Sequence, residues 1–470
     1  MKVCSISRCW GMPFLVLAAW ASQFTPDALV RAAEFSPIVG PQLVARAEGS
    51  SQPIAPLPPT PSTHRPVVER GLFAGQSELS LEQLVLAVEA RNPSLQAAAA
   101  VWRAAAARYP QVISLKDPMF AFMLATANVG ANEGEAGYLL EVSQEVPWFG
   151  KRRLRGQQAL AEAGAARSET GDVRLQLAEA ARIAFSSYYL ADRLAAVNAD
   201  TSRLLDEFLL VARQRYEVGQ TTQQDLLQAE LELAQLHSRR AEFRRDVGVA
   251  TARINTLLHQ PPGCPLPPPP RNLAVPEPPS SPEPLHALAL QSRPDLAAQA
   301  ARIQARQAAL ALACKEYYPD MELIGRYDAT MEDEAMRPMV GMAFNVPIQL
   351  QRRSAAVREA TARIQQETAE YQNRVNQARY DVQAAYERLV QGRAILRLYS
   401  DRILPAAEQN IEAALANYTT GNIDFLRLLD AERQLNNQRE AYHSTVAEYH
   451  QRLAELQRAV GGALPMPEIR

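Results

Sequence analysis

The spacing of apolar residues is helical over two long stretches of the chain. After residue 151, apolar and small side chains recur at steps of four, three and seven residues, which is typical of helices that pack as coiled coils. The positions form two series, Val173, Leu177, Ala180, Ala184, Ser187, Ala191 and Leu194 in one, and Ile183, Leu190, Val197, Leu204 and Val211 in the other. Two series on one helix predict a neighbouring helix on each side. At about 1.5 Å per residue, a helix over residues 151–216 is roughly 100 Å long.

The second half of the chain repeats the first. Its long helix carries the series Val375, Ala378, Val382, Ala385, Leu389, Gly392, Leu396, Tyr399 and Ile403. Residues also match at a nearly constant separation: 92–95 (NPSL) with 293–296 (RPDL), 146–153 with 346–353 at a separation of 200, and 216–230 with 418–432 at a separation of 202. The last pair shares Tyr-x2-Gly followed by Leu-Leu-x-Ala-Glu. We infer an internal duplication, in which each half reads helix, strand pair, long helix, turn, long helix.

Four short segments between the helices alternate apolar and polar residues with period two, as β-strands do. They lie at about 118–129 and 137–147 in the first half and at about 320–331 and 338–347 in the second. Turn-like or acidic loops at 130–135 and 332–334 separate the members of each pair. Segments of this length suit a tilted membrane crossing, yet four strands cannot close a membrane barrel. The pattern therefore predicts either a barrel shared by several chains or two soluble hairpins.

The amino terminus has the features of a secretory signal peptide. Lys2 and Arg8 precede an apolar stretch at residues 10–21, which ends in a small-residue cleavage site, Ala19-Trp20-Ala21. The stretch is shorter than the roughly 20 residues that a membrane span needs. We therefore expect residues 1–21 to be removed and the protein to be exported.

Composition and charge exclude several classes of protein. The 470 residues carry 49 Lys and Arg against 51 Asp and Glu, so the chain has no excess of positive charge with which to bind nucleic-acid phosphates. A mean hydropathy of −0.22 excludes a polytopic bundle of membrane helices. Cys4 and Cys9 precede the apolar stretch, which predicts no lipid anchor, and Cys264 and Cys314 alone do not make a disulfide scaffold.

Two proline-rich stretches divide the chain, because proline denies a helix its backbone donors and favours extended segments. The expected organisation is a signal peptide at 1–21, a Pro-rich arm at 22–75, a first repeat at 76–260 with a helical hairpin at 151–258, a Pro-rich linker at 261–285, a second repeat at 286–462 with a hairpin at 351–460, and a tail at 463–470.

With these features the chain resembles the TolC-type outer-membrane efflux proteins of bacteria over nearly all of residues 76–462. The duplication, the strand pairs and the Tyr-x2-Gly turns carry the resemblance. Residues 146–152 (VPWFGKR) are similar to the strand-to-helix junction of the branch that exports heavy-metal cations. The resemblance implies a mainly α-helical fold with a membrane β-barrel portion. In this fold a homotrimer forms a 12-stranded outer-membrane barrel, which a helical barrel continues through the periplasm.

The resemblance also implies partners and a mode of action. Such a channel sits in outer-membrane lipid and docks onto a periplasmic adaptor (membrane fusion) protein and an inner-membrane RND-type pump. It is passive, because the pump supplies the energy, and it needs no cofactor. Its cargo is small molecules or metal cations, with drugs or a type I secreted polypeptide as alternatives. A different interpretation, an exported coiled-coil scaffold that spans no membrane, stays open at this point.

The resemblance assigns roles to the two turns. Tyr216 and Gly219 in the first repeat, and Tyr418 and Gly421 in the second, correspond to the periplasmic tips of the helical hairpins, where adaptors dock. Glycine suits a chain reversal between helices because a left-handed conformation costs it little.

Acidic residues just beyond the second tip ring the closed aperture in characterised members of the family. Three carboxylates around a narrow pore attract cations and repel anions. Asp430 occupies one such position, but Arg427 occupies the other. Asp225 stands at the Arg427-equivalent position of the first repeat, where Gln228 replaces Asp430. We hypothesise that Arg427 contacts Asp225 or Asp430 and so latches the closed aperture.

Motifs of catalysis and of metal binding are missing from the sequence. It has no strand-bounded phosphate loop, nucleophile elbow, HExxH helix or paired CxxC, so we expect no enzyme and no catalytic residues. His443 and His450 are two helical turns apart, which disfavours a shared metal. Four methionines near the second strand pair could offer soft thioethers to Cu(I), although packing or lipid contact is the simpler role and we predict no resident metal; they are Met331, Met336, Met339 and Met342.

Overall fold

The computed structural model describes residues 72–73, 75–125, 137–219, 222–331 and 333–464. The expected signal peptide, nearly all of the Pro-rich arm and the loop at 130–135 lie outside these residues. The chain divides into two units, Met1–Val68 and Glu69–Arg470, and the description that follows concerns the second.

Each half contains short helices, two strands and a long helical hairpin. In the first half the elements are α1 (Leu81–Arg91), α2 (Pro93–Ile113), β1 (Met119–Ala125), β2 (Gly137–Val146), α3 (Lys151–Glu217) and α4 (Gln223–Leu257). In the second half they are α5 (Glu283–Ser292), α6 (Pro294–Lys315), β3 (Met321–Asp328), a 3₁₀ turn η3 (Glu334–Met336), β4 (Pro338–Phe344), α7 (Leu350–Leu398), a π-helical turn η4 (Tyr399–Ile403), α8 (Leu404–Thr420) and α9 (Phe425–Val460). This confirms the predicted mainly helical fold with two strand pairs.

The two strand pairs form one antiparallel sheet in the order β1-β2-β3-β4, not two separate hairpins. Glu141 of β2 lies opposite Arg326 of β3, whose Nε donates to its carboxylate at 2.9 Å. On this face the two central strands carry charged side chains, whereas β1 and β4 contribute methionine, alanine and glycine. The alternate positions are exposed and apolar, and they include Phe120, Phe122, Leu140, Val142, Leu323, Val340, Met342 and Phe344. The sheet thus presents one apolar face and one face that is polar along its two central strands.

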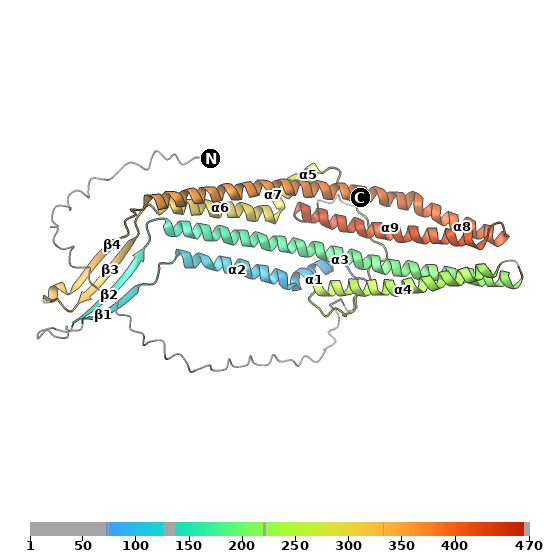
Figure 1. Cartoon of the computed structure of the whole chain (residues 1–470), viewed down its shortest axis with the longest axis horizontal. Helices are drawn as coiled ribbons and strands as arrows, with labels where there is room; N and C mark the ends of the chain where they lie inside the picture. The colour runs from blue at the N-terminus through green and yellow to red at the C-terminus, as the bar shows by residue number, and fades with distance from the viewer. Residues whose placement is uncertain (1–71, 74, 126–136, 220–221, 332, 465–470) are drawn as a thin grey trace, which may run out of the picture. The chain divides into compact units, whose positions relative to one another are not determined.

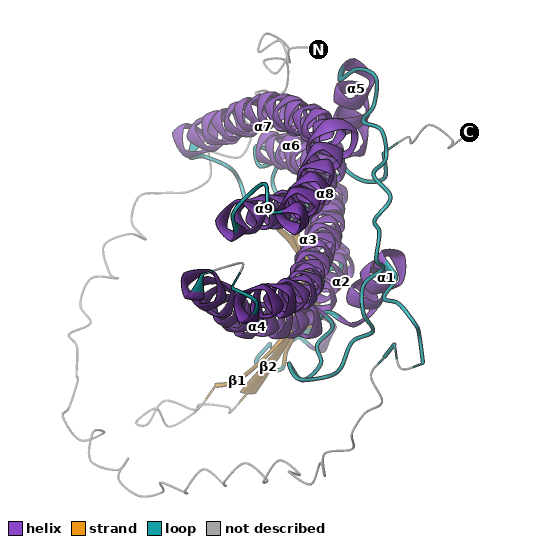
Figure 2. Ribbon diagram, turned by 90° about the vertical axis from the view of Figure 1, so that its right-hand side faces the viewer, coloured by secondary structure: helices purple, strands orange, loops and turns teal. Residues whose placement is uncertain are grey.

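The sheet lies at one end of the long helices and the hairpin turns lie at the other (Figure 1). Next to the sheet, α3 packs between α2 and α6, and α6 packs against α7. Further along, α3 packs against α4 and α9, and α9 packs against α7 and α8. The small helices α1 and α5 lie on the same side of this layer, at the right in Figure 2.

Short helices meet end to end at the two matched motifs, 92–95 and 293–296. The amide of Asn92, just before α2, donates to the carbonyl of Leu257 at the end of α4 at 3.0 Å, and its Oδ1 caps Ser94 N at 2.9 Å. In the second half, Ser292 Oγ donates to the carbonyl of Val460 at the end of α9 at 2.5 Å. Arg293, the residue equivalent to Asn92, also donates from Nη1 to the carbonyl of Ala459 in the last turn of α9 at 3.4 Å. The repeated motif therefore joins the start of one helix to the end of another.

The proline-rich segment 261–282 follows the helices as an extended strap. Proline carries a carbonyl but no N–H, and the strap is held through its carbonyls: Tyr188 donates to Pro267 at 3.1 Å and Asn255 to Pro262 at 2.9 Å. Glu277 of the strap accepts hydrogen bonds from Arg393 and Arg397 of α7, and these bonds lower its pKa to about 2. The strap thereby contacts helices of both halves.

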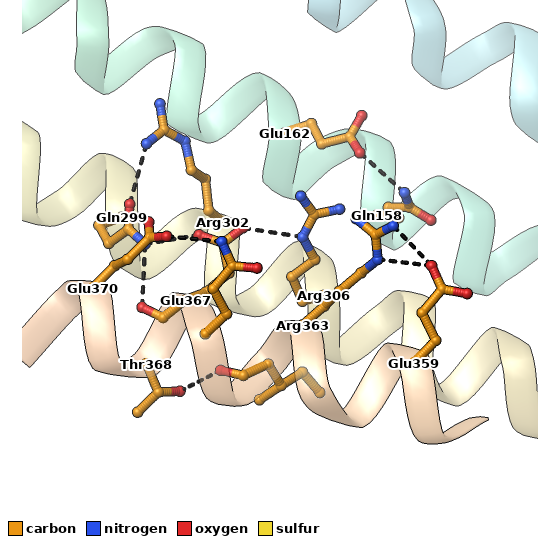
Figure 3. Close-up of polar contacts among 12 residues, drawn as sticks. Gln158, Glu162, Gln299, Arg302, Arg306, Glu359, Arg363, Glu367, Thr368 and Glu370 are labelled. Atoms are coloured by element: carbon orange, nitrogen blue, oxygen red, sulfur yellow. Dashed lines mark hydrogen bonds and ion pairs between the residues drawn. The ribbon is translucent and has the colours of Figure 1, made fainter. Parts of the chain in front are cut away.

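A buried polar network joins α6 to α7 (Figure 3). Gln299 of α6 is fully buried and donates to the carboxylate of Glu367 on α7 at 2.8 Å and to the Glu367 carbonyl at 3.2 Å. Arg306 donates to the other oxygen of the same carboxylate at 3.1 Å. Burial of the Glu367 charge is therefore compensated by an arginine and an amide.

The joint between α2 and α4 yields a stability prediction. Replacing Asn92 with Ala removes both the helix cap and the bond to Leu257, and we expect it to lower the free energy of unfolding by about 1–3 kcal/mol. Asn92→Ser keeps a capping hydroxyl but does not reach Leu257, so its loss should be intermediate. Thermal unfolding in detergent measures both. Equal stability of Asn92→Ala and the parent protein would contradict a stabilising joint.

Candidate functional site at the hairpin ends

Glycine makes both chain reversals at the ends of the hairpins. Gly219 has a φ of +73° and Gly421 a φ of +80°, in the left-handed region that other residues rarely adopt. The N–H of Gly421 donates to the carbonyl of Tyr418 at 3.0 Å, which closes the end of α8. The residues proposed as docking tips therefore lie where the helices reverse, at the end far from the sheet (Figure 1).

The two tip tyrosines differ in environment although the sequence aligns them. Tyr216 is 42% exposed, whereas Tyr418 is 2% exposed. The ring of Tyr418 packs edge-on against Phe425 at 5.7 Å and lies under the guanidinium of Arg215 at 4.7 Å. Only the tyrosine of the first hairpin is open to a partner.

Arg215 connects the two hairpin ends, and the sequence analysis missed it. Its Nη1 donates to the carbonyl of Tyr418 at 2.6 Å and its Nη2 to that of Thr419 at 3.3 Å. These carbonyls belong to the last turn of α8, where a cation is favourable. The repeat offered a signal, because the equivalent position in the second half holds Asn417.

Asp225 begins α4 as part of a capping box. The N–H of Asp225 donates to Thr222 Oγ1 at 3.3 Å, and the N–H of Thr222 donates to the Asp225 carboxylate at 3.2 Å. A carboxylate in the first turn of a helix also interacts favourably with the helix dipole. Asp225 thus has a structural role besides the predicted one at the aperture.

Arg427 and Asp430 are both exposed on the first turns of α9. Asp430 pairs with Arg433 at 3.7 Å, and its side chain is 73% exposed. Among the ion pairs of the described residues, none joins Arg427 to Asp225 or to Asp430. The latch therefore stays a hypothesis, in which the exposed Arg427 would reach a carboxylate of a neighbouring chain.

Two ion pairs between α4 and α9 were not found from the sequence. Arg433 Nε donates to Glu232 Oε2 at 3.1 Å, and Arg239 pairs with Glu440 at 3.6 Å. The Glu232 side chain is 11% exposed, so its pair with Arg433 is little screened by water. These pairs connect the first hairpin to the second.

Beside them, Glu432 of α9 is a buried carboxyl with 3% exposure. Burial and the nearby charge of Glu232 raise its pKa from 4.5 to about 7, against the opposing effect of Arg433 and Arg239. The equivalent residue of the first repeat, Glu230, pairs with Arg213 at 3.7 Å near the surface. Near neutral pH, Glu432 is therefore poised to hold or lose a proton.

The other chemical candidates lie apart from one another. Burial lowers the pKa values of His443 and His450 to about 4. In the part of the chain that the structure describes, no group of three or more His, Cys, Asp or Glu could hold a metal ion. Met339 and Met342 stand at odd and even positions of β4 and so face opposite sides of the sheet. None of the described helices is apolar enough over a sufficient length to span a membrane.

Comparison with known proteins identifies this arrangement. Residues 285–462 match the family model of the outer membrane efflux protein. Over these residues the chain is similar to the outer membrane efflux protein family. The cobalt-zinc-cadmium resistance protein CzcC of Cupriavidus metallidurans is 29% identical over 187 residues, which are 39% of this chain and 44% of CzcC. The match thus spans less than half the length of that relative.

Solved structures show that the outer membrane efflux fold extends over most of the chain. CusC superimposes with a TM-score of 0.72 at 18% identity, covering 82% of this chain and 93% of CusC. The open state of the MtrE outer membrane channel of Neisseria gonorrhoeae gives a TM-score of 0.69 at 20% identity, covering 81% and 89%. At such identity the likeness concerns the fold alone.

The buried Glu432 predicts a pH-dependent stability. Its pKa is higher in the folded protein than in the unfolded chain, so folding takes up a proton, and stability is lost as the pH rises from about 4.5 to about 7. Glu432→Gln should lack this loss and be more stable than the parent protein at pH 8, measured by thermal unfolding. Glu230→Gln is the matched control and should keep the parent profile. A parent-like pH profile in Glu432→Gln would contradict the prediction.

Proposed function

We propose that the protein is the outer-membrane channel of a tripartite efflux system. One observation carries the proposal: a four-stranded sheet with an exposed apolar face continues directly into helices tens of ångströms long. An apolar face of this kind is stable in lipid, and its polar opposite face suits a water-filled lumen. The efflux family and fold support the same function.

The functional unit in this proposal is a homotrimer. Strands β1 and β4 end the sheet of one chain, and an open strand edge is not viable in lipid. Three copies joined edge to edge, β4 to β1, give a closed 12-stranded barrel. The helices that flank the strands in the chain, α2 and α3 in the first half and α6 and α7 in the second, would then continue the barrel into the periplasm.

The partners are a periplasmic adaptor and an inner-membrane RND-type pump, because a passive channel needs a source of energy. We place adaptor docking at the tips, Tyr216 and Gly219 with Tyr418 and Gly421. The exposed ring of Tyr216 and the exposed Val218 beside it support the first tip as a contact surface. The ring of Tyr418 is buried, so at the second tip it would stabilise the turn from inside the protein.

Metal cations are the cargo that we propose. The relative CzcC is a cobalt-zinc-cadmium resistance protein, and this likeness carries the proposal, because Glu141 and Glu145 on the polar face of the sheet are paired with Arg326 and Lys116. Drugs or a secreted polypeptide are the alternative cargo. A scaffold that spans no membrane has no need of the exposed apolar face of the sheet.

Insertion into lipid tests the proposed channel directly. The protein purified from outer membranes in detergent should give stable currents in planar bilayers. Phe122→Asp with Val340→Asp places charges on the apolar face and should abolish insertion, whereas the matched pair Ala121→Asp and Ala343→Asp, on the polar face, should still insert. A protein that stays soluble without detergent and gives no current would favour the scaffold instead.

The aperture is proposed at Asp225, Asp430 and Arg427, where copies of the second tip would meet around the axis. If Arg427 binds a carboxylate of a neighbouring chain in the closed state, Arg427→Ala removes the latch. We expect severalfold higher conductance and leakage of large antibiotics into cells. Arg240→Ala, an exposed arginine further along α4, is the control. Unchanged conductance and leakage in Arg427→Ala would rule out the latch.

A further inference from the structure

The methionines of the described chain are confined to the sheet and its β3–β4 connection. Of the ten methionines in the sequence, Met1, Met12 and Met466 lie outside the described residues. Helices α1 to α9 contain none, and the other seven are Met119, Met123, Met321, Met331, Met336, Met339 and Met342. Propensity predicts the reverse, because methionine is a good helix former, whereas strands favour β-branched and aromatic residues. The distribution therefore indicates a role for thioethers in the sheet.

Three of these methionines stand on the polar face of the sheet, on its two outer strands. Strand pairing places Met119 and Met123 of β1 on the same face as Glu141, and Met339 of β4 opposite Arg326. The side chain of Met119 is 68% exposed and that of Met123 is 55% exposed. Packing within one chain therefore does not account for the two methionines of β1.

In the proposed barrel, β4 of one chain pairs with β1 of the next, and we call this junction the seam. Pairing keeps residues of one face opposite one another. On this face of β1, Met119 and Met123 flank Ala121. Wherever Met339 pairs along β1, a methionine therefore lies directly opposite, at about 4.5–5.5 Å between Cβ atoms, or diagonally, at about 7–8 Å, within reach of long side chains.

The surroundings of these thioethers suit a soft cation. Ala121 of β1 and Gly341 of β4 are small residues on the same face, and they leave the sulfur atoms open to the lumen. The charge of Arg326, beside Met339, is balanced by Glu141, whose carboxylate accepts a hydrogen bond from its Nε at 2.9 Å. Thioether sulfur selects soft cations such as Cu(I), whereas carboxylate and carbonyl oxygens suit hard ones. Binding by neutral ligands is weak enough for an ion to leave again, as passage through a channel requires.

We propose that each seam forms a two-thioether site for a soft monovalent cation, Cu(I) or Ag(I). Its ligands are Met339 of one chain and Met119 or Met123 of the neighbouring chain, so a trimer holds three such sites. The site rests on the proposed channel function, because only the closed barrel brings the two outer strands together. It adds soft monovalent cations to the proposed cargo.

Titration of the trimer with Ag(I) tests the site, because Ag(I) prefers sulfur as Cu(I) does and is stable in air. The protein lacks residues 1–21 and is kept in detergent without chloride. Competing sulfur ligands are removed from this parent by Cys264→Ser, Cys314→Ser, Met331→Leu and Met336→Leu. Calorimetry should show about one Ag(I) per chain. Met339→Leu, or Met119→Leu with Met123→Leu, should weaken binding at least about tenfold without unfolding the protein, because leucine has a similar volume.

Two controls show where the ligands come from. Met321→Leu with Met342→Leu removes thioethers from the apolar face of the sheet and should leave Ag(I) binding as in the parent. Co-expression of Met339→Leu chains with Met119→Leu, Met123→Leu chains gives mixed trimers, in which about a quarter of the seams combine an intact β4 with an intact β1. These trimers should regain parent-like affinity at that fraction of sites.

The outcomes separate the site from the channel function. Undiminished Ag(I) binding in both polar-face variants overturns the site, whether or not the protein conducts, and so does a failure of mixed trimers to regain binding. A parent protein that conducts but does not bind Ag(I) overturns the site and leaves the channel function standing. Binding that is restored in mixed trimers but accompanied by no current upholds the site and counts against the channel function.

Discussion

The end-to-end contact between helices is the interaction on which the rest of the structure depends. A helix leaves carbonyls without partners at its end and N–H groups without partners at its start. Asn92 serves both, because it caps α2 and donates to the last turn of α4. With α2 and α4 joined in this way, a single helix of 67 residues, α3, can pack along both. The corresponding residue of the second half, Arg293 at the start of α6, donates to the last turn of α9 and brings α6 and α9 together against α3 and α7.

Local patterns in the sequence were enough to predict the helices, the strands and the hairpin ends. The heptad series marks α3 and α7, and the glycine of each Tyr-x2-Gly motif does make a left-handed turn. The contacts between the hairpins could not be predicted in this way. Arg215 and Tyr418 are 203 residues apart, and Glu232 and Arg433 are 201 apart. Which such residues meet depends on how the two hairpins are placed, and periodicity does not determine that.

The capping role of Asp225, in contrast, could have been recognised. Thr222 and Asp225 have the spacing of a capping box, which is a sequence signal for a helix start. The π-helical turn also left a trace, because the separation between the repeats changes from 200 at Gln351 to 202 at Tyr418. An insertion of two residues in a packed helix must be absorbed locally or it rotates every buried side chain that follows. The even heptad series through Tyr399 and Ile403 concealed where this happens.

The duplicated halves differ most in what surrounds their second long helices. In the first half, α4 packs mainly against α3, and Glu230 stays near the surface with Arg213. In the second half, α9 packs against α3, α7 and α8, which buries Glu432 at the equivalent position. The two hairpins are nevertheless held together by polar contacts, because Arg215, Glu232 and Arg239 of the first hairpin bind Tyr418, Arg433 and Glu440 of the second.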